Sequence, residues 1–171
     1  MKEKNRIITR IYESPCGTLM LGSFGDKLCL CDWQVERHRD HVDNRLRRLL
    51  DAEFLDGTSA VIDTAIAQLD EYFAGTRQEF NVPVLFAGTD FQKKVWNALL
   101  TIPFGNTVSY REIGRRIGMP KAVRAVANAN GANSISIFVP CHRVIGSDNT
   151  LTGYGGGLAT KEFLLKLERA I

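Results

Sequence analysis

The stretch SYREIGRRIGMPKAVRAVANAN, residues 109–130, predicts two short helices joined by a tight turn. A capping box at Ser109–Glu112 favours the start of the first helix, and Gly118 is typical of its end. Pro120 suits the first position of the second helix, which we expect to run to about Asn130. Two helices with so short a connection are typical of a helix-turn-helix, although the same hairpin is also a common packing unit.

The second helix of this pair is rich in alanine. Ala122, Ala125 and Ala129 recur at intervals of three and four, which predicts a smooth stripe that another backbone can approach closely. Few long polar groups are available for base edges, so we expect loose sequence preference and a possible approach to the minor groove. Alanine packed inside the protein is the alternative. The pair also carries five basic residues that suit phosphates: Arg111, Arg115, Arg116, Lys121 and Arg124.

Charge divides the chain into two halves. Residues 1–87 carry 11 basic and 14 acidic side chains, a net charge of −3, whereas residues 88–171 carry 11 and 5, a net charge of +6. A basic half suggests that this half faces a polyanion, although an ordinary solvated surface has the same charge. The chain lacks an apolar signal core near Met1 and a bilayer-compatible segment, so we expect a cytoplasmic protein with reduced cysteines.

Hydrophobic patterns predict an α/β fold in two parts. We expect domain 1–87 to form a small antiparallel sheet packed by helices, and domain 88–171 to be mostly helical. The first part shows strands over 7–12, 18–24 and 27–33, with a hairpin signal at Gly25-Asp26, helices over 39–52 and from about 59 to Gly75, and an edge strand or connector over 80–86. The second shows a helix capped at 89–92, the helix pair, a β-type run over 135–139, and a closing helix over 160–170 with Phe163, Leu164 and Leu167 as apolar residues.

Cys141 is the strongest candidate for chemistry. A nucleophilic cysteine needs its thiolate, and His142 and Arg143 follow it directly. Neighbouring residues on an extended chain point in opposite directions, so the chain must turn here or a water must join Cys141 to His142. Glu168 is a plausible partner for the imidazole. A buried, inert thiol is the alternative for an isolated Cys-His pair.

The wider context of Cys141 resembles a known family. Pro140-Cys141-His142-Arg143-Val144-Ile145-Gly146, with Asn133 before it and a Tyr154–Glu162 segment after it, is similar to the O6-alkylguanine-DNA alkyltransferases, also called methylated-DNA–protein-cysteine methyltransferases. The likeness is dense from Phe91 to Glu168 and fragmentary before Phe91. It implies DNA repair by direct reversal. A damaged guanine is flipped out of duplex DNA, and its O6-alkyl group, or the O4-alkyl group of thymine, moves once to the cysteine.

The resemblance also implies roles for individual residues. Cys141 is the alkyl acceptor, His142 its base through a water, Glu168 the group that orients His142, Asn133 a brace, and Tyr110 the proton donor to guanine. Arg124 takes the place of the flipped base, within a DNA-binding set of Arg124, Ala125, Ala129, Tyr110, Arg111 and Lys121. An alkylguanine pocket is formed by Val139, Tyr154, Gly155 and Gly156.

Several positions depart from the family pattern, among them Ser134 and Gly155 at the pocket border, which puts the accepted alkyl size in question. The resemblance implies no cofactor and a monomer acting on double-stranded DNA. Some relatives bind zinc in the N-terminal domain, but Cys29-x-Cys31 misses the usual ligand spacing and we expect no metal. The alternatives from other classes are a non-catalytic protein that binds alkylated DNA, a cysteine hydrolase and a transcription regulator.

Overall fold

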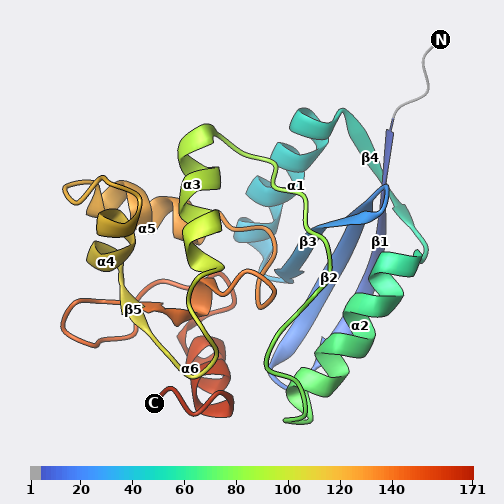
Figure 1. Cartoon of the computed structure of the whole chain (residues 1–171). Coiled ribbons are helices and arrows are strands. Elements are labelled where there is room, and N and C mark those ends of the chain that lie inside the picture. The colour runs from blue at the N-terminus through green and yellow to red at the C-terminus, as the bar shows by residue number, and fades with distance from the viewer. Residues whose placement is uncertain (1–4) are drawn as a thin grey trace. The chain divides into compact units, whose positions relative to one another are not determined.

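The computed structural model describes residues 5–171, except for the side chains of residues 36–38. The chain divides into two compact units, Met1–Gly88 and Thr89–Ile171, and each is described by itself. Figure 1 shows strands gathered in the first unit and short helices in the second. This agrees with the mixed α/β fold expected from the sequence.

The first unit is built on a four-stranded sheet in the order β3-β2-β1-β4. The antiparallel part, β1 (Asn5–Ser14), β2 (Gly17–Phe24) and β3 (Lys27–Trp33), follows the predicted strands closely. The fourth strand, β4 (Ala52–Asp56), was not predicted, and it pairs in parallel with β1. It begins where the expected helix over 39–52 ends, because Asp51 adopts a left-handed conformation (φ 47°) that turns the chain.

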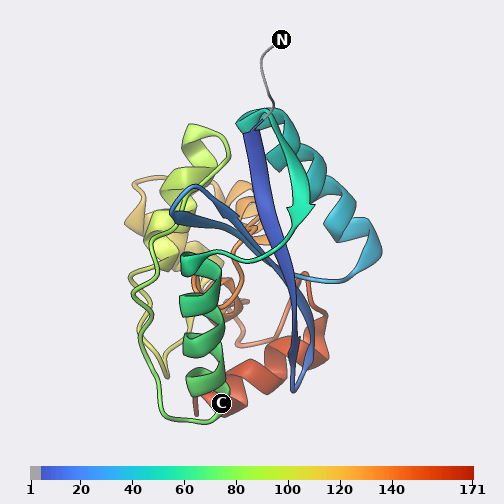
Figure 2. The ribbon, with the colours of Figure 1, turned by 90° about the vertical axis from the view of Figure 1, so that its right-hand side faces the viewer.

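Two helices pack against opposite faces of this sheet (Figure 2). Ile7 and Tyr12 lie on opposite faces of β1, because side chains alternate along a strand. Ile7 belongs to a core cluster with Val42 and Leu46 of α1 (Glu36–Leu50). Tyr12 instead donates a hydrogen bond of 2.7 Å to Asp70 of α2 (Ala60–Phe73). The segment over 80–86, expected as an edge strand or a connector, is a connector with an isolated β-bridge that joins Val84 to Leu28.

The second unit contains four α-helices among its described residues. These are α3 (Asp90–Leu99), α4 (Tyr110–Arg116), α5 (Val123–Gly131) and α6 (Leu158–Leu167). The Thr89 capping box forms as predicted, and Ser109 caps α4 by accepting the Glu112 N–H. A short parallel pairing of β5 (Val108–Ser109) with β6 (Val144–Ile145) joins distant parts of the unit. Between α5 and β6 the chain makes one 3-10 turn, η1 (Cys141–Arg143).

Two expectations for this unit were wrong. The second helix of the pair begins at Val123 rather than at Pro120, because a turn closed by the bond from Ala122 N–H to the Met119 carbonyl comes first. The run over 135–139 is not a strand. Its Ile137 has φ 73°, and the side chain of Asn133 takes hydrogen bonds that strand partners would otherwise make.

Candidate active site and DNA-binding surface

Cys141 begins the η1 turn and is only 4 % exposed. The turn therefore replaces the extended chain that would have sent Cys141 and His142 in opposite directions. Two asparagines hold the backbone on either side of it. Asn133 donates to the Val139 carbonyl at 3.0 Å, and the Cys141 N–H donates to the same carbonyl at 2.8 Å. Asn130 at the end of α5 donates to the Cys141 carbonyl at 3.3 Å.

His142 and Glu168 form a completely buried pair next to the thiol. His142 Nε2 lies 2.7 Å from Glu168 Oε2, and both side chains are 0 % exposed. Glu168 also accepts two bonds from Arg143, of 2.7 Å and 3.1 Å. The other histidine nitrogen, Nδ1, is buried and has no hydrogen-bond partner among the described residues. Because Glu168 accepts at Nε2, a neutral His142 carries its proton there and leaves Nδ1 as an open acceptor.

The charges around this pair keep Glu168 ionised and His142 neutral. Burial alone would raise the pKa of Glu168, but the hydrogen bonds from His142 and Arg143, together with the charge of the Arg143 guanidinium, outweigh it and hold that pKa well below its usual range. Burial lowers the pKa of His142, and the cations Arg143 and Lys161 lower it further, against the opposing effect of Glu168. The imidazole is therefore placed to accept a proton briefly and to pass it on, rather than to hold it.

Tyr110 opens α4 and faces the segment that follows β6. Its hydroxyl donates to the Thr152 carbonyl at 3.1 Å. Burial raises the pKa of Tyr110, and the negative charge of a Cys141 thiolate raises it as well, which indicates that the phenol and the sulfur are within electrostatic range. Tyr110 is therefore a protonated phenol at neutral pH.

Lys161 is the site residue that the sequence analysis missed. It is 0 % exposed, and its ammonium donates to the Val144 carbonyl at 2.6 Å and to the Thr152 carbonyl at 2.8 Å. The closing helix had been expected to present Phe163, Leu164 and Leu167, yet Phe163 is 39 % exposed. Lys161 lies three residues before the buried Leu164, so the helical period was a signal that could have placed it on the buried face.

The residues expected around the pocket differ in exposure. Val139 is fully buried, whereas Tyr154, Gly155 and Gly156 are half-buried in the loop before α6. The structure thus pairs His142 with Glu168, and it brings Asn133 and Cys141 together on the Val139 carbonyl, to which both donate. It connects Tyr110 to the same region through Thr152, which also binds Lys161.

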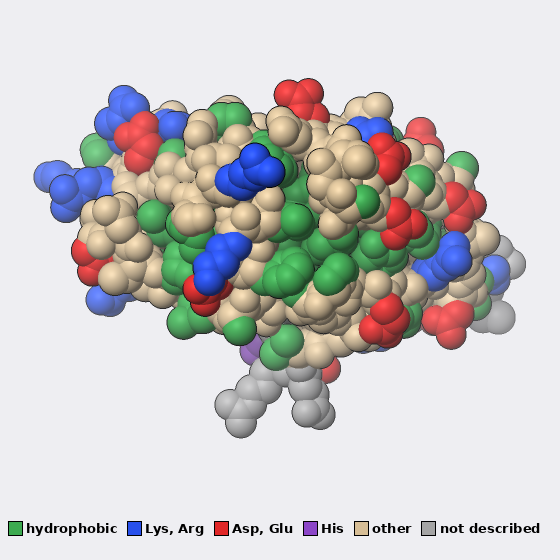
Figure 3. Space-filling model, turned by 90° about the horizontal axis from the view of Figure 1, so that it is seen from below, with side chains coloured by type: hydrophobic (Ala, Val, Ile, Leu, Met, Phe, Trp, Pro, Cys, Tyr) green, Lys and Arg blue, Asp and Glu red, His purple; other side chains and the backbone are tan. Residues whose placement is uncertain are grey.

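The helix pair exposes part of the surface expected to meet DNA. Arg124 and Ala125 are exposed on α5, but Ala129 is 3 % exposed and its carbonyl accepts the Trp96 indole N–H at 2.8 Å. The alanine stripe therefore turns into the core at its far end. Arg111 and Lys121 are also exposed. In Figure 3, Lys and Arg side chains gather at the left, over the unit that carries this helix pair.

Comparison with known proteins assigns the family. Residues 7–86 match the ribonuclease-like domain of 6-O-methylguanine DNA methyltransferase, and residues 90–170 match its DNA-binding domain. A methylated-DNA–protein-cysteine methyltransferase of Methanosarcina barkeri is 45% identical over 158 residues, which cover 92% of this chain and 94% of that protein. The chain belongs to the 6-O-methylguanine DNA methyltransferase family.

Solved structures of this family have the same fold. The crystal structure of Mycobacterium tuberculosis O6-methylguanine methyltransferase is similar with a TM-score of 0.81 and 45% identity, over 96% of this chain and 93% of that one. The M. tuberculosis OGT protein in complex with DNA is also similar, with a TM-score of 0.81 and 44% identity over the same shares. The likeness therefore extends over both units of the chain.

The zinc site of some family members does not fit this chain. Cys29 and Cys31 are both completely buried in the sheet, and burial raises the pKa of Cys29 to about 12, which opposes the thiolate that a metal requires. No group of three or more potential ligands occurs among the described residues. The side chain of His38, another potential zinc ligand, lies outside the described residues.

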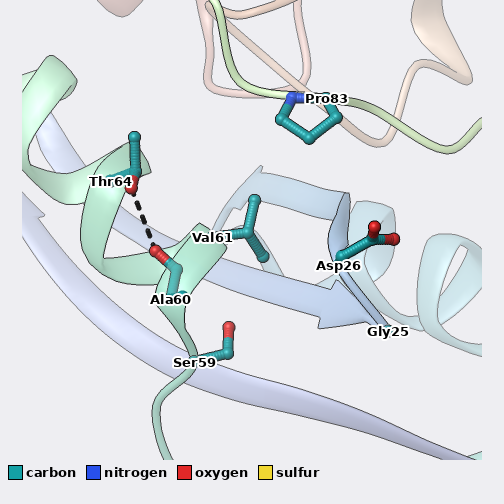
Figure 4. A pocket seen from close by; sticks show the side chains of 7 residues that line it. All are labelled: Gly25, Asp26, Ser59, Ala60, Val61, Thr64 and Pro83. Atoms are coloured by element: carbon teal, nitrogen blue, oxygen red, sulfur yellow. Dashed lines mark hydrogen bonds between the residues drawn. The ribbon is translucent and has the colours of Figure 1, made fainter.

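A pocket lies in the first unit, between the β2–β3 hairpin and the start of α2 (Figure 4). It has a volume of about 340 Å³ and is lined by Gly25, Asp26, Ser59, Ala60, Val61, Thr64 and Pro83. Its lining contains no cysteine and no buried charged side chain. Over residues 5–171, no helix is long and apolar enough to cross a bilayer.

Proposed function

We propose that this protein repairs DNA by direct reversal, in a single transfer of an alkyl group from guanine O6 to the sulfur of Cys141. Family membership supports the reaction class, and the arrangement at Cys141 supports the acceptor. The observation that carries the proposal is the buried Glu168–His142 pair, which leaves an open nitrogen acceptor on the residue next to the thiol. A thiol needs such an acceptor to become a nucleophile.

The reaction follows from these groups. The thiol proton leaves through a water to His142 Nδ1, and the Cys141 thiolate attacks the alkyl carbon. A carbon–sulfur bond forms while the carbon–oxygen bond breaks, and its electron pair stays on the guanine. The Tyr110 phenol then donates its proton to the departing base. A thioether is a poor leaving group, so each molecule reacts once.

The helix pair is proposed to deliver the base. Arg111 and Lys121 suit the phosphates of the duplex, and Arg124 is proposed to fill the gap that the flipped base leaves, which offsets an unstacking cost of a few kcal/mol. Ala125 permits close approach, while Ala129 supports the helix from inside. Val139 and the loop Tyr154–Gly156 are proposed to line the alkyl pocket, which would also take O4-alkylthymine.

We also propose a separate role for each of the two domains. We assign DNA binding and alkyl acceptance to the domain over 88–171, and support of that domain to residues 1–87. The transfer requires a reduced thiol and one protein molecule per lesion. We therefore propose that the protein acts as a monomer in the reducing cytoplasm.

Mass measurement after reaction tests the proposal. The protein is incubated with excess duplex DNA that carries O6-methylguanine, and peptide mapping then locates the adduct. One added methyl group on Cys141 is expected, with none on Cys141→Ala, which should still bind the duplex. Binding without an adduct would favour the non-catalytic alkylated-DNA-binding protein. Guanine restored beyond one equivalent would favour a hydrolase.

A further inference from the structure

One carboxylate lies among the positive charges of the helix pair. From residue 109 to residue 131 the sequence holds five basic residues and a single acidic residue, Glu112, on the first turn of α4. Its side chain accepts two hydrogen bonds from Arg115, from Nε at 2.8 Å and from Nη2 at 2.6 Å. It also accepts one from Arg116 Nε at 3.1 Å. One acidic side chain thus holds the Nε edges of two guanidinium groups.

These contacts form a network rather than one isolated ion pair. The Arg115 contact is bidentate, which is the strongest geometry for a guanidinium and a carboxylate. Arg116 also donates from Nη1 to Thr101, just beyond α3, at 3.0 Å. The hydrogen bonds from the two arginines lower the pKa of Glu112 to about 2, so the carboxylate is charged at neutral pH. An exposed ion pair alone contributes little, but bidentate contacts and networks contribute more.

The other three basic residues of the helix pair are Arg111, Lys121 and Arg124. All three are exposed, and none of them forms an ion pair with a described residue. Arg115 comes four residues after Arg111, on the same face of α4, so it would extend the positive charge along that face. Its Nε edge is directed to Glu112 instead, and a phosphate has to compete for that edge. The helix pair therefore offers a duplex fewer free cations than its sequence contains.

We propose that Glu112 limits the affinity of this protein for undamaged DNA by keeping Arg115 and Arg116 away from the phosphates. This inference rests on the proposed function, because it concerns DNA binding by the helix pair. Contacts with phosphates carry no sequence information, so they strengthen binding to undamaged sites as well as to lesions. A protein that reacts once must leave undamaged sites before it reaches a lesion. Two guanidinium groups held by Glu112 make that dissociation faster.

Binding to undamaged duplex DNA over a range of salt concentrations tests this inference without alkyl transfer. Fluorescence anisotropy of a labelled duplex gives the affinity of the wild type and of Glu112→Gln, which keeps the side-chain length and removes the charge. The affinity at low salt should rise by about tenfold. The slope of log affinity against log salt should steepen by about 1 to 2, as expected for one or two further phosphate contacts. Glu162→Gln is the matched control, because it removes an exposed carboxylate on α6 that pairs with Lys166, and it should leave both quantities nearly unchanged.

A second set of variants shows whether the two arginines cause the gain in affinity. Arg115→Gln/Arg116→Gln is made alone and together with Glu112→Gln. In that background the gain from Glu112→Gln should be smaller by about threefold or more, because the groups that it releases are missing. An equal gain without the two arginines would overturn the inference. A loss of affinity in Glu112→Gln would also overturn it, since Glu112 would then orient the arginines toward the phosphates.

A measurement on the wild type serves if Glu112→Gln does not fold. The Nε–H signals of Arg115 and Arg116 are followed by NMR while undamaged duplex is added. They should keep their positions, whereas the Arg124 signal should shift. Shifts of the Arg115 and Arg116 signals as large as that of Arg124 would contradict the inference. None of these readouts requires a lesion, so failure to form a methyl adduct on Cys141 would count against the proposed alkyl transfer alone.

Discussion

Glu168 Oε2 lies 2.7 Å from His142 Nε2, with both side chains withdrawn completely from solvent. The same carboxylate binds Arg143, which also donates to the Ile102 carbonyl at 2.7 Å. One acidic residue near the end of the chain thus fixes the tautomer of the residue beside the thiol and anchors the turn that presents it. Glu168 has a structural and an electrostatic role at once, and the two can be separated by experiment.

Replacement of Glu168 by glutamine should destabilise the protein by about 3–5 kcal/mol, because it leaves the buried Arg143 guanidinium without its counter-charge. The free energy of unfolding, measured in urea, checks this. Glu162→Gln on the same helix is the control, since its pair with Lys166 is about half exposed and should contribute less than about 1 kcal/mol. Equal losses of unfolding free energy in the two variants would show that the Glu168–Arg143 contact adds no more stability than the exposed ion pair.

Stability should fall as the pH drops below about 6.5. The pKa of His142 is lower in the folded protein than its ordinary 6.5, so the unfolded chain binds this proton more tightly. His142 is neutral at pH 7. The free energy of unfolding then falls progressively as the pH drops from 6.5 toward the pKa that His142 has in the folded protein. Glu168 affects the pH dependence of stability only below about pH 4.5. Its pKa is depressed in the folded protein, so the stability that its charge provides is lost only in that range. Thermal melting from pH 5 to 8 should show this slope in the wild type and a weaker one in His142→Gln.

Tyr110→Phe should slow the single-turnover transfer by roughly a hundredfold, because the departing guanine loses its proton donor. The ring remains, so affinity for the duplex should change little. Rapid-quench measurement of the transfer and a separate binding titration give the two quantities. The assigned proton donation would be refuted by an unchanged transfer rate.

Arg124→Ala should slow repair of duplex DNA by about tenfold or more, and should leave reaction with the free modified base unchanged. The exposed guanidinium is proposed to stabilise the flipped state, which a free base does not require. Lys121→Ala is the matched comparison. Loss of that phosphate contact should weaken duplex binding and reduce its dependence on salt. Equal slowing of both substrates by Arg124→Ala would remove its proposed role.

Local patterns predicted those parts of the fold whose interactions are local. The β2–β3 hairpin follows from alternation around Gly25-Asp26, and α3 follows from its Thr89 capping box. Strand β4 was missed because its partner β1 lies far away in the sequence and its five residues carry no alternation of their own. The run over 135–139 has β-branched residues, but the Asn133 side chain and the left-handed Ile137 give it another conformation.

At the candidate site, too, the residues set by local patterns were predicted and a residue that depends on distant contacts was not. Cys141 and His142 stand out as a dipeptide, and Glu168, 26 residues away from His142, was named as a partner of the imidazole before the resemblance gave it the same role. Lys161 was overlooked because lysine on a helix is usually solvated. Its burial depends on two carbonyls, that of Val144 in β6 and that of Thr152 in the loop after β6, and no nearby residue pattern reveals that they meet.

Lys161→Met should make the protein more stable at pH 7. The pKa of Lys161 falls from its ordinary 10.5 to about 8, so at pH 7 the folded protein holds a proton less tightly than the unfolded chain does. The buried ammonium therefore costs stability below pH 8, and the free energy of unfolding rises between pH 8 and 10.5. A methionine of similar length removes that cost and should add about 1–3 kcal/mol at pH 7. Urea unfolding at pH 7 and 9.5 tests this, because the advantage of the variant should shrink at the higher pH. A variant that is less stable at pH 7 would mean that the two carbonyl hydrogen bonds outweigh the cost of burying the charge.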